Sequence, residues 1–63
     1  MTFGEKIKIT RLRLFLSQEK FAKELGVSFA TINRWERGHC EPSYDGQKAF
    51  HEFCEKNHVD FDE

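Results

Sequence analysis

The short link "GVS" at residues 26–28 is the feature that most constrains how this chain folds. The segment before it, residues 18–25, follows a capping serine, Ser17, and repeats apolar residues at helical spacing. The segment after it, residues 29–37, lies between the serine of the link and Gly38, a residue type that often ends helices. So short a link does not let two helices lie side by side, so the pair must cross steeply.

Two further helices are predicted around this pair. Thr2 and Glu5 fit a capping box, from which a helix runs to about Leu14. Ser43 can cap another segment that ends near Asn57 and carries one apolar stripe. The chain is therefore predicted to be all-α, with four to five short helices in a single domain over its 63 residues.

Some packing details are less determined by the sequence. Ile9 and Leu12 form a second apolar pair on the first helix, which either widens the core stripe or meets a partner; we expect the core. Gly46 is expected to weaken the start of the last helix by about 1 kcal/mol relative to Ala. Residues 39–42, "HCEP", are predicted to form an exposed connection, and the acidic end, residues 58–63, is expected to fray unless its apolar side chains dock.

Charge is unevenly distributed along the chain. The net charge is −1, but residues 1–39 carry eight Lys and Arg against four acids, whereas residues 40–63 carry two against seven. The basic half supplies the cations that phosphate binding requires, although the whole chain is slightly acidic. This distribution fits a binding face opposite an acidic end, and it also fits a solvated surface that is merely uneven.

The sequence lacks the features of a membrane span or a secretion signal. We therefore expect no membrane contact and a cytoplasmic, nucleoid-associated location. In that compartment Cys40 and Cys54 are expected to be reduced thiols, with Cys54 in the core.

The outward side of the segment 29–37 suggests a function. Only Ile32 and Trp35 point one way, and the other side carries an amide, a guanidinium, a hydroxyl and small or flat apolar groups. Such a set suits base edges in a DNA major groove, where Arg grips guanine, Asn pairs with adenine and apolar groups touch the thymine methyl. An ordinary surface helix with a wet polar side is the alternative. The preceding helix, the tight link and the basic half favour a helix-turn-helix.

The stretch "LSQEKFAKELGVSFATINRWERG" resembles the helix-turn-helix of the Cro/C1 repressors, also called the xenobiotic response element (XRE) family. The resemblance extends over roughly residues 3–57 and is densest over residues 16–38. It implies a lambda-repressor-like fold that binds double-stranded DNA through its second and third helices, as a transcriptional regulator, most often a repressor. We expect no cofactor, and a homodimer on a palindromic site.

The resemblance assigns roles to individual residues. Gln18 would contact a phosphate and brace the third helix, and Glu36 would pair with Arg11; otherwise Arg11 binds phosphate and Glu36 is solvated. Residues that fall where the family reads bases or contacts the backbone complete the predicted DNA-binding set: Ser17, Gln18, Ser28, Phe29, Ala30, Thr31, Asn33, Arg34, Arg37 and His39.

This sequence departs from the family pattern at three places. Phe15 stands where relatives often have a glycine that ends the first helix, which leaves the geometry of that corner open. Phe29 replaces a common polar residue, so contact with thymine, packing against a sugar and a different specificity are all open. Residues 40–63 are more acidic than in many relatives, which argues against backbone contacts beyond His39.

Functions other than DNA binding have less support in the residues. A zinc site from the His and Cys residues lacks the usual two-residue Cys spacing, and a small helical bundle leaves little room for a catalytic pocket, so we expect neither metal nor catalysis. Two rivals remain open. One is an antitoxin or protein-interaction module that holds a partner with its acidic C-terminal half, and the other is the DNA-targeting domain of a larger protein.

Overall fold

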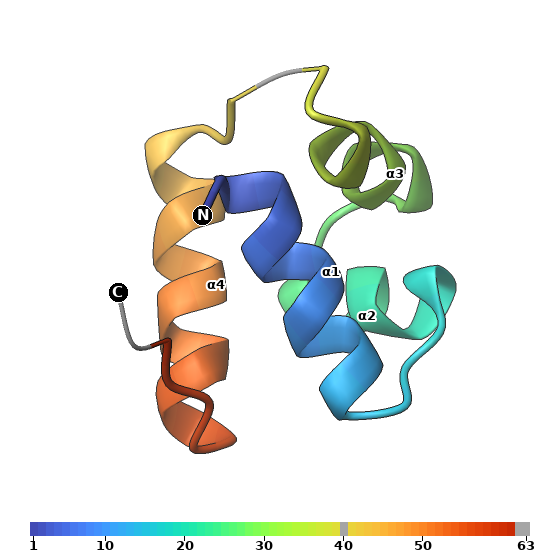
Figure 1. The fold of residues 1–63 in the computed structure, drawn as a ribbon. Helices are drawn as coiled ribbons and strands as arrows, with labels where there is room; N and C mark the ends of the chain where they lie inside the picture. Colours follow the sequence, from blue (N-terminus) through green and yellow to red (C-terminus); the bar gives the residue numbers. More distant parts are fainter. Residues whose placement is uncertain (40, 62–63) are drawn as a thin grey trace.

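A computed structural model describes residues 1–39 and 41–61, which form four α-helices and no strand (Figure 1). The helices are α1 (Phe3–Arg13), α2 (Gln18–Leu25), α3 (Phe29–Arg37) and α4 (Tyr44–Lys56). α1 packs on α3, and α2 packs on both α3 and α4. The all-α prediction is confirmed, and each predicted helix is found at its expected place.

Each of these four helices begins at a hydroxyl side chain. Thr2 and Glu5 form the predicted capping box, in which the Thr2 hydroxyl accepts from the Glu5 amide and the Glu5 carboxylate accepts from the Thr2 amide. This pair of hydrogen bonds lowers the pKa of Glu5. Ser17, Ser28 and Ser43 each accept the amide three residues later. These caps satisfy amides that have no partner inside the helix.

The same four helices also share one way of ending. A residue with positive φ follows each last turn, and the next amide donates to the carbonyl five residues earlier, as in a Schellman motif. Glycine takes this place after α2 and α3, but phenylalanine and histidine take it after α1 and α4. The four residues and their φ angles are Phe15 (56°), Gly26 (72°), Gly38 (77°) and His58 (57°). Phe15 therefore ends α1 in the conformation that Gly26 and Gly38 adopt after α2 and α3.

The core is aromatic and receives side chains from all four helices. The rings of Phe3 and Trp35 meet edge to face at 5.3 Å between centroids, and those of Phe21 and Phe53 do so at 5.1 Å. Such pairs add to the free energy gained from burial alone. The buried apolar residues are Ile7, Phe21, Ala22, Leu25, Ile32, Trp35, Phe50, Phe53, Cys54 and Val59.

Two glycines allow helices to approach Trp35 closely. A Cβ on Gly4 would collide with the Trp35 carbonyl oxygen, so α1 and α3 meet there through their backbones. A Cβ on Gly46 would lie 2.9 Å from Trp35 Cζ2 and 3.0 Å from Cη2, too close to the indole ring. The missing side chain of Gly46 therefore lets α4 pack closely against Trp35. The low helix propensity of glycine does not indicate this role.

The expectation that Ile9 and Leu12 widen the core is wrong. Leu12 is 53% exposed and Ile9 is half-buried, and neither belongs to the core cluster. The buried residues of α1 are instead Gly4, Ile7 and Thr10, and the backbone at Gly4 approaches α3 closely. The burial of Thr10, a polar residue, has no signal in the apolar pattern.

The segments on either side of α4 make more contacts with the core than the sequence suggests. His39 and Glu41 are exposed, as predicted for this connection, but Pro42 is buried; Cys40 lies outside the described residues. At the other end Val59 is buried and Phe61 packs against the core, so both apolar side chains of the acidic end dock. Phe61 lies beneath the Lys6 ammonium and the Arg13 guanidinium, each 5.7 Å from its ring centroid.

Cys54 is a free, buried thiol. Burial raises its pKa above the ordinary value of a cysteine, because the interior disfavours the charged thiolate. Its predicted place in the core is confirmed, whereas the other cysteine, Cys40, lies outside the described residues.

Candidate nucleic-acid interface

α2 and α3 cross steeply on one side of the molecule and are joined by residues 26–28 (Figure 1). Only Ile32 and Trp35 of α3 are buried, and Ile32 is fully enclosed. These two side chains attach α3 to the core along a narrow stripe. Phe29, Ala30, Arg34 and Arg37 are exposed on the opposite side, which faces outward as the sequence predicts.

The ten predicted DNA-binding residues all lie outside the hydrophobic core. Gln18, Thr31 and Asn33 are half-buried, and the other seven are exposed: Ser17, Ser28, Phe29, Ala30, Arg34, Arg37 and His39. The structure brings the start of α2 beside α3, so residues from both elements share one surface.

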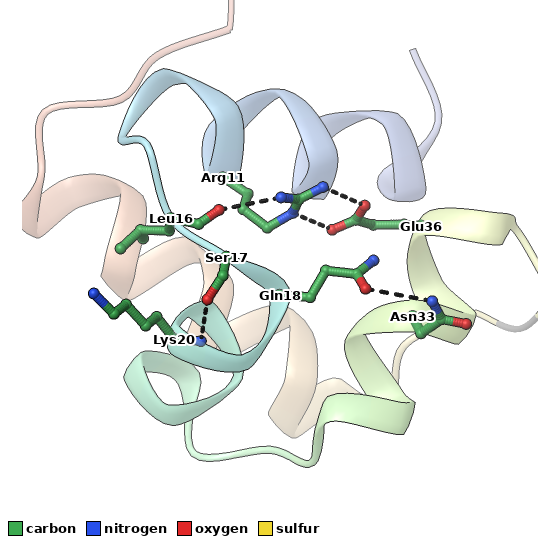
Figure 2. Close-up of polar contacts among 7 residues, drawn as sticks. All are labelled: Arg11, Leu16, Ser17, Gln18, Lys20, Asn33 and Glu36. Carbon is green, nitrogen blue, oxygen red and sulfur yellow. Dashed lines mark hydrogen bonds and ion pairs between the residues drawn. The ribbon is translucent and has the colours of Figure 1, made fainter.

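A side-chain bridge joins the two helices of the pair. The Asn33 amide nitrogen donates to Gln18 Oε1 over 3.4 Å, a long hydrogen bond (Figure 2). Gln18 therefore braces α3, as the family resemblance implies. The Asn33 carbonyl is not used in this bridge.

Two hydroxyls at the start of α3 are bonded to each other. Ser28 Oγ accepts the Thr31 amide at 3.1 Å and lies 2.9 Å from Thr31 Oγ1. Ser28 is therefore occupied as a helix cap, and Thr31 is oriented toward its own helix terminus rather than freely outward. Both hydroxyls are partly committed to the fold.

An ion pair holds α1 to the end of α3. Arg11 Nε and Nη2 donate to the two Glu36 carboxylate oxygens at 2.7 and 3.0 Å, and Arg11 Nη1 donates to the Leu16 carbonyl (Figure 2). Only 14% of the Arg11 side chain and 7% of the Glu36 side chain are exposed. The hydrogen bonds with Glu36 raise the pKa of Arg11, so the guanidinium stays charged. The pairing implied by the resemblance is confirmed, and the Glu36 charge is neutralised.

An open groove of about 540 Å³ runs over this surface between the three helices. It contains Lys8, Ser17, Gln18 and Phe29, with the Arg11–Glu36 pair and Glu19 along it. Neither Lys8 nor Glu19 belongs to the DNA-binding set predicted from the sequence. A signal for Lys8 exists, because it lies one helical turn before Arg11 and therefore on the same side of α1.

Metal ligands do not cluster in residues 1–39 and 41–61, where no group of three or more His, Cys, Asp and Glu side chains could hold a metal ion. Within the same residues no helix is long and apolar enough to cross a membrane.

Comparison with known proteins gives a family match. The sequence matches the model of the helix-turn-helix family over residues 7–45. It is 40% identical over 43 residues to the HTH-type transcriptional regulator DicA of Escherichia coli strain K12. The match covers 68% of this chain and 32% of DicA, so the chain corresponds to about a third of that relative's length. No solved structure matches significantly.

Proposed function

Because the chain belongs to the Cro/C1-type (XRE) helix-turn-helix family of DNA-binding regulators, we propose that it binds double-stranded DNA sequence-specifically, with α3 in the major groove. The observation that carries the proposal is the burial of α3 through Ile32 and Trp35, which leaves Phe29, Ala30, Arg34 and Arg37 exposed on its other side. A major groove is about 12 Å wide and admits one helix presented in this way.

We assign base contacts to the outward side of α3 and backbone contacts to its surroundings. Arg34 is exposed and suits the two acceptors of guanine, and Asn33 keeps its carbonyl and one N–H for adenine. Ser17 and Gln18, at the start of α2, would hold one phosphate, and Arg37 and His39 another. Phe29, Ala30 and Thr31, with the cap Ser28, complete the surface that faces the groove.

We further propose that the protein represses transcription as a homodimer on a palindromic site. One such domain contacts only a few base pairs, and two copies about 34 Å apart give useful specificity. Leu12 and Ile9 are the candidate dimer contact, because both lie outside the hydrophobic core, whereas the C-terminal Val59 and Phe61 pack on the core of their own chain.

Selection from a random duplex library tests whether a site exists. We expect enrichment of one sequence whose two halves are related by a two-fold axis. Enrichment of a single half would retain DNA binding and remove the dimer, and no enrichment at all would remove sequence-specific binding.

Two substitutions then separate base reading from phosphate binding. Arg34→Ala is expected to weaken binding to the selected site by about 1–3 kcal/mol and to relax the preference at one base pair. Gln18→Ala is expected to weaken binding to all sequences more evenly, because its partner is the backbone and α3 itself. Equal losses of Arg34→Ala on selected and random DNA would show that Arg34 does not read a base.

One observation favours a second partner besides DNA. Acidic side chains gather in the part of the chain after α3, and Glu41, Asp45, Glu52, Glu55 and Asp60 are all exposed. An antitoxin that holds a basic protein there while α3 binds its operator would use both halves, and a neighbouring toxin gene would support this. A native polypeptide that continues beyond Glu63 would instead indicate the targeting domain of a larger protein.

A further inference from the structure

The first turn of α3 presents an apolar surface where the proposed DNA contact begins. Phe29 is 49% exposed and Ala30 is also exposed, and both lie outside the hydrophobic core. Phe29 borders the groove that also contains Ser17 and Gln18, the proposed phosphate contacts. A large apolar side chain therefore lies beside the proposed phosphate contacts and outside the hydrophobic core.

The polar groups of the same turn are engaged within the protein. The Ser28 and Thr31 hydroxyls bond to each other, and Ser28 also caps the helix. Hydrogen-bonded recognition of bases by the hydroxyls of this turn is consequently restricted, whereas Asn33 and Arg34, further along α3, keep polar groups for base contacts.

Base edges in the major groove differ in what they offer to an apolar side chain. Donors and acceptors of adenine, guanine and cytosine would lose their water against a phenylalanine ring and gain no hydrogen bond in return. The 5-methyl group of thymine is the apolar feature of these edges, and it gains by leaving water. An apolar first turn therefore selects for thymine.

We propose that Phe29 and Ala30 are specificity-determining residues that recognise thymine 5-methyl groups, so that the half-site has A·T pairs facing the first turn of α3 and a G·C pair facing Arg34. The inference rests on the proposed binding of α3 in the major groove. It adds which chemical group the first turn recognises.

Deoxyuridine substitution tests the proposal because uracil differs from thymine only by the missing methyl. In the selected site, each thymine is replaced singly by deoxyuridine and the dissociation constant is measured by fluorescence anisotropy. We expect about a fourfold loss of affinity at one or two positions per half-site, the value for one buried methyl group. A second comparison replaces the A·T pair at such a position by a G·C pair whose cytosine takes the place of thymine. The duplex with 5-methylcytosine should bind more tightly than the same duplex with unmethylated cytosine.

Protein variants assign the effect to Phe29. At the thymine that Phe29 contacts, the ratio of the uracil to the thymine dissociation constant should fall from about four in the parent to close to one in Phe29→Ala. Tyr44→Ala is the matched control, because Tyr44 is an aromatic residue that is 80% exposed on α4, outside this groove, and the ratio should stay unchanged. Because Phe29 lies outside the core, its variant should keep the melting temperature of the parent.

The possible failures are distinguishable. If a site is enriched but every uracil duplex binds as tightly as its thymine parent, the inference is overturned while DNA binding stands. If Phe29→Ala weakens thymine and uracil duplexes equally, Phe29 packs against a sugar and the inference is again overturned. If no sequence is enriched, the proposed function itself fails.

Discussion

At the scale of single residues, the helix ends show where this chain accepts strain. Phe15 and His58 adopt the left-handed conformation that Gly26 and Gly38 adopt in the equivalent places. For an L-residue that conformation costs roughly 1–2 kcal/mol, whereas glycine reaches it freely. The Phe15 ring recovers none of this cost by burial, because it is 96% exposed.

Phe15→Gly is therefore expected to stabilise the protein by about 1 kcal/mol, after the greater entropy of glycine in the unfolded chain is taken into account. This corresponds to a rise of roughly 4–8 °C in the melting temperature of a domain of this size. Phe15→Ala removes the ring but keeps the strain, so it should change the melting temperature little. A lower melting temperature for the glycine variant would mean that the aromatic ring itself stabilises the fold.

Gly46→Ala is expected to destabilise the protein, although alanine is the better helix former. Its Cβ would lie 2.9 and 3.0 Å from two atoms of the Trp35 ring, and overpacking of this kind costs about 1–3 kcal/mol. Urea unfolding measures the difference in the free energy of unfolding. Lys48→Ala, an exposed substitution in the same helix, should stay within about 0.5 kcal/mol of the parent. A Gly46→Ala variant as stable as the parent would contradict the close contact.

At the scale of elements, α3 is oriented by two contacts with α1, namely the Gly4 backbone approach and the Arg11–Glu36 pair. Arg11 also bonds the Leu16 carbonyl, at the corner that leads into α2. One guanidinium thus fixes α1, the start of the helix-turn-helix and the end of α3 relative to one another.

Removing one partner of this pair leaves the other charge mostly buried. Glu36→Ala is therefore expected to lower the free energy of unfolding by about 2–4 kcal/mol. Replacing both residues with apolar ones, Arg11→Met with Glu36→Leu, should cost less than the sum of the two single substitutions. A double-mutant cycle by urea unfolding measures the coupling, and additive single losses would show that the two side chains act independently.

The helices themselves are predictable because local signals define them. Ser17, Ser28 and Gly38 mark helix ends through hydrogen bonds to residues three to five positions away. Such signals lie within one stretch of sequence, so the four helices and the outward side of α3 follow from the sequence alone.

Contacts between distant segments could not be derived in the same way. The burial of Thr10 and the close approach of Gly4 and Gly46 to Trp35 depend on how helices meet, which periodicity within one helix does not encode. The Arg11–Glu36 pair is predicted by the family resemblance and not by the spacing of residues within one helix. The residues of the candidate site were predictable, but their internal hydrogen bonds, such as Asn33 with Gln18, depend on the folded arrangement.

At the scale of the whole molecule, the uneven charge shapes the response to salt. The basic excess lies in residues 1–39, which contain α1, α2 and α3, whereas the acidic excess lies in the part that contains α4. Phosphate contacts would therefore come from one part of a molecule whose net charge is only −1.

Affinity for the selected duplex is expected to fall with added salt, by about 0.9 log units per phosphate contact for each log unit of salt. Arg37→Ala should lower the magnitude of this slope by about one, because it removes one proposed phosphate contact. Lys48→Ala, on α4, should leave the slope unchanged. A parent slope near zero would contradict electrostatic contact with the backbone.

The separation between the buried and the exposed residues of α3 has a consequence for how a DNA-binding protein of this kind could change the sequence it recognises. Ile32 and Trp35 are the buried residues of α3, whereas Phe29, Ala30 and Arg34 are exposed and lie outside the hydrophobic core. Under the proposed binding mode, substitutions at those three positions would change the recognised DNA sequence while leaving the fold intact. Descendants of one ancestral chain can therefore diverge to separate operators by a few substitutions, each tolerated as it arises.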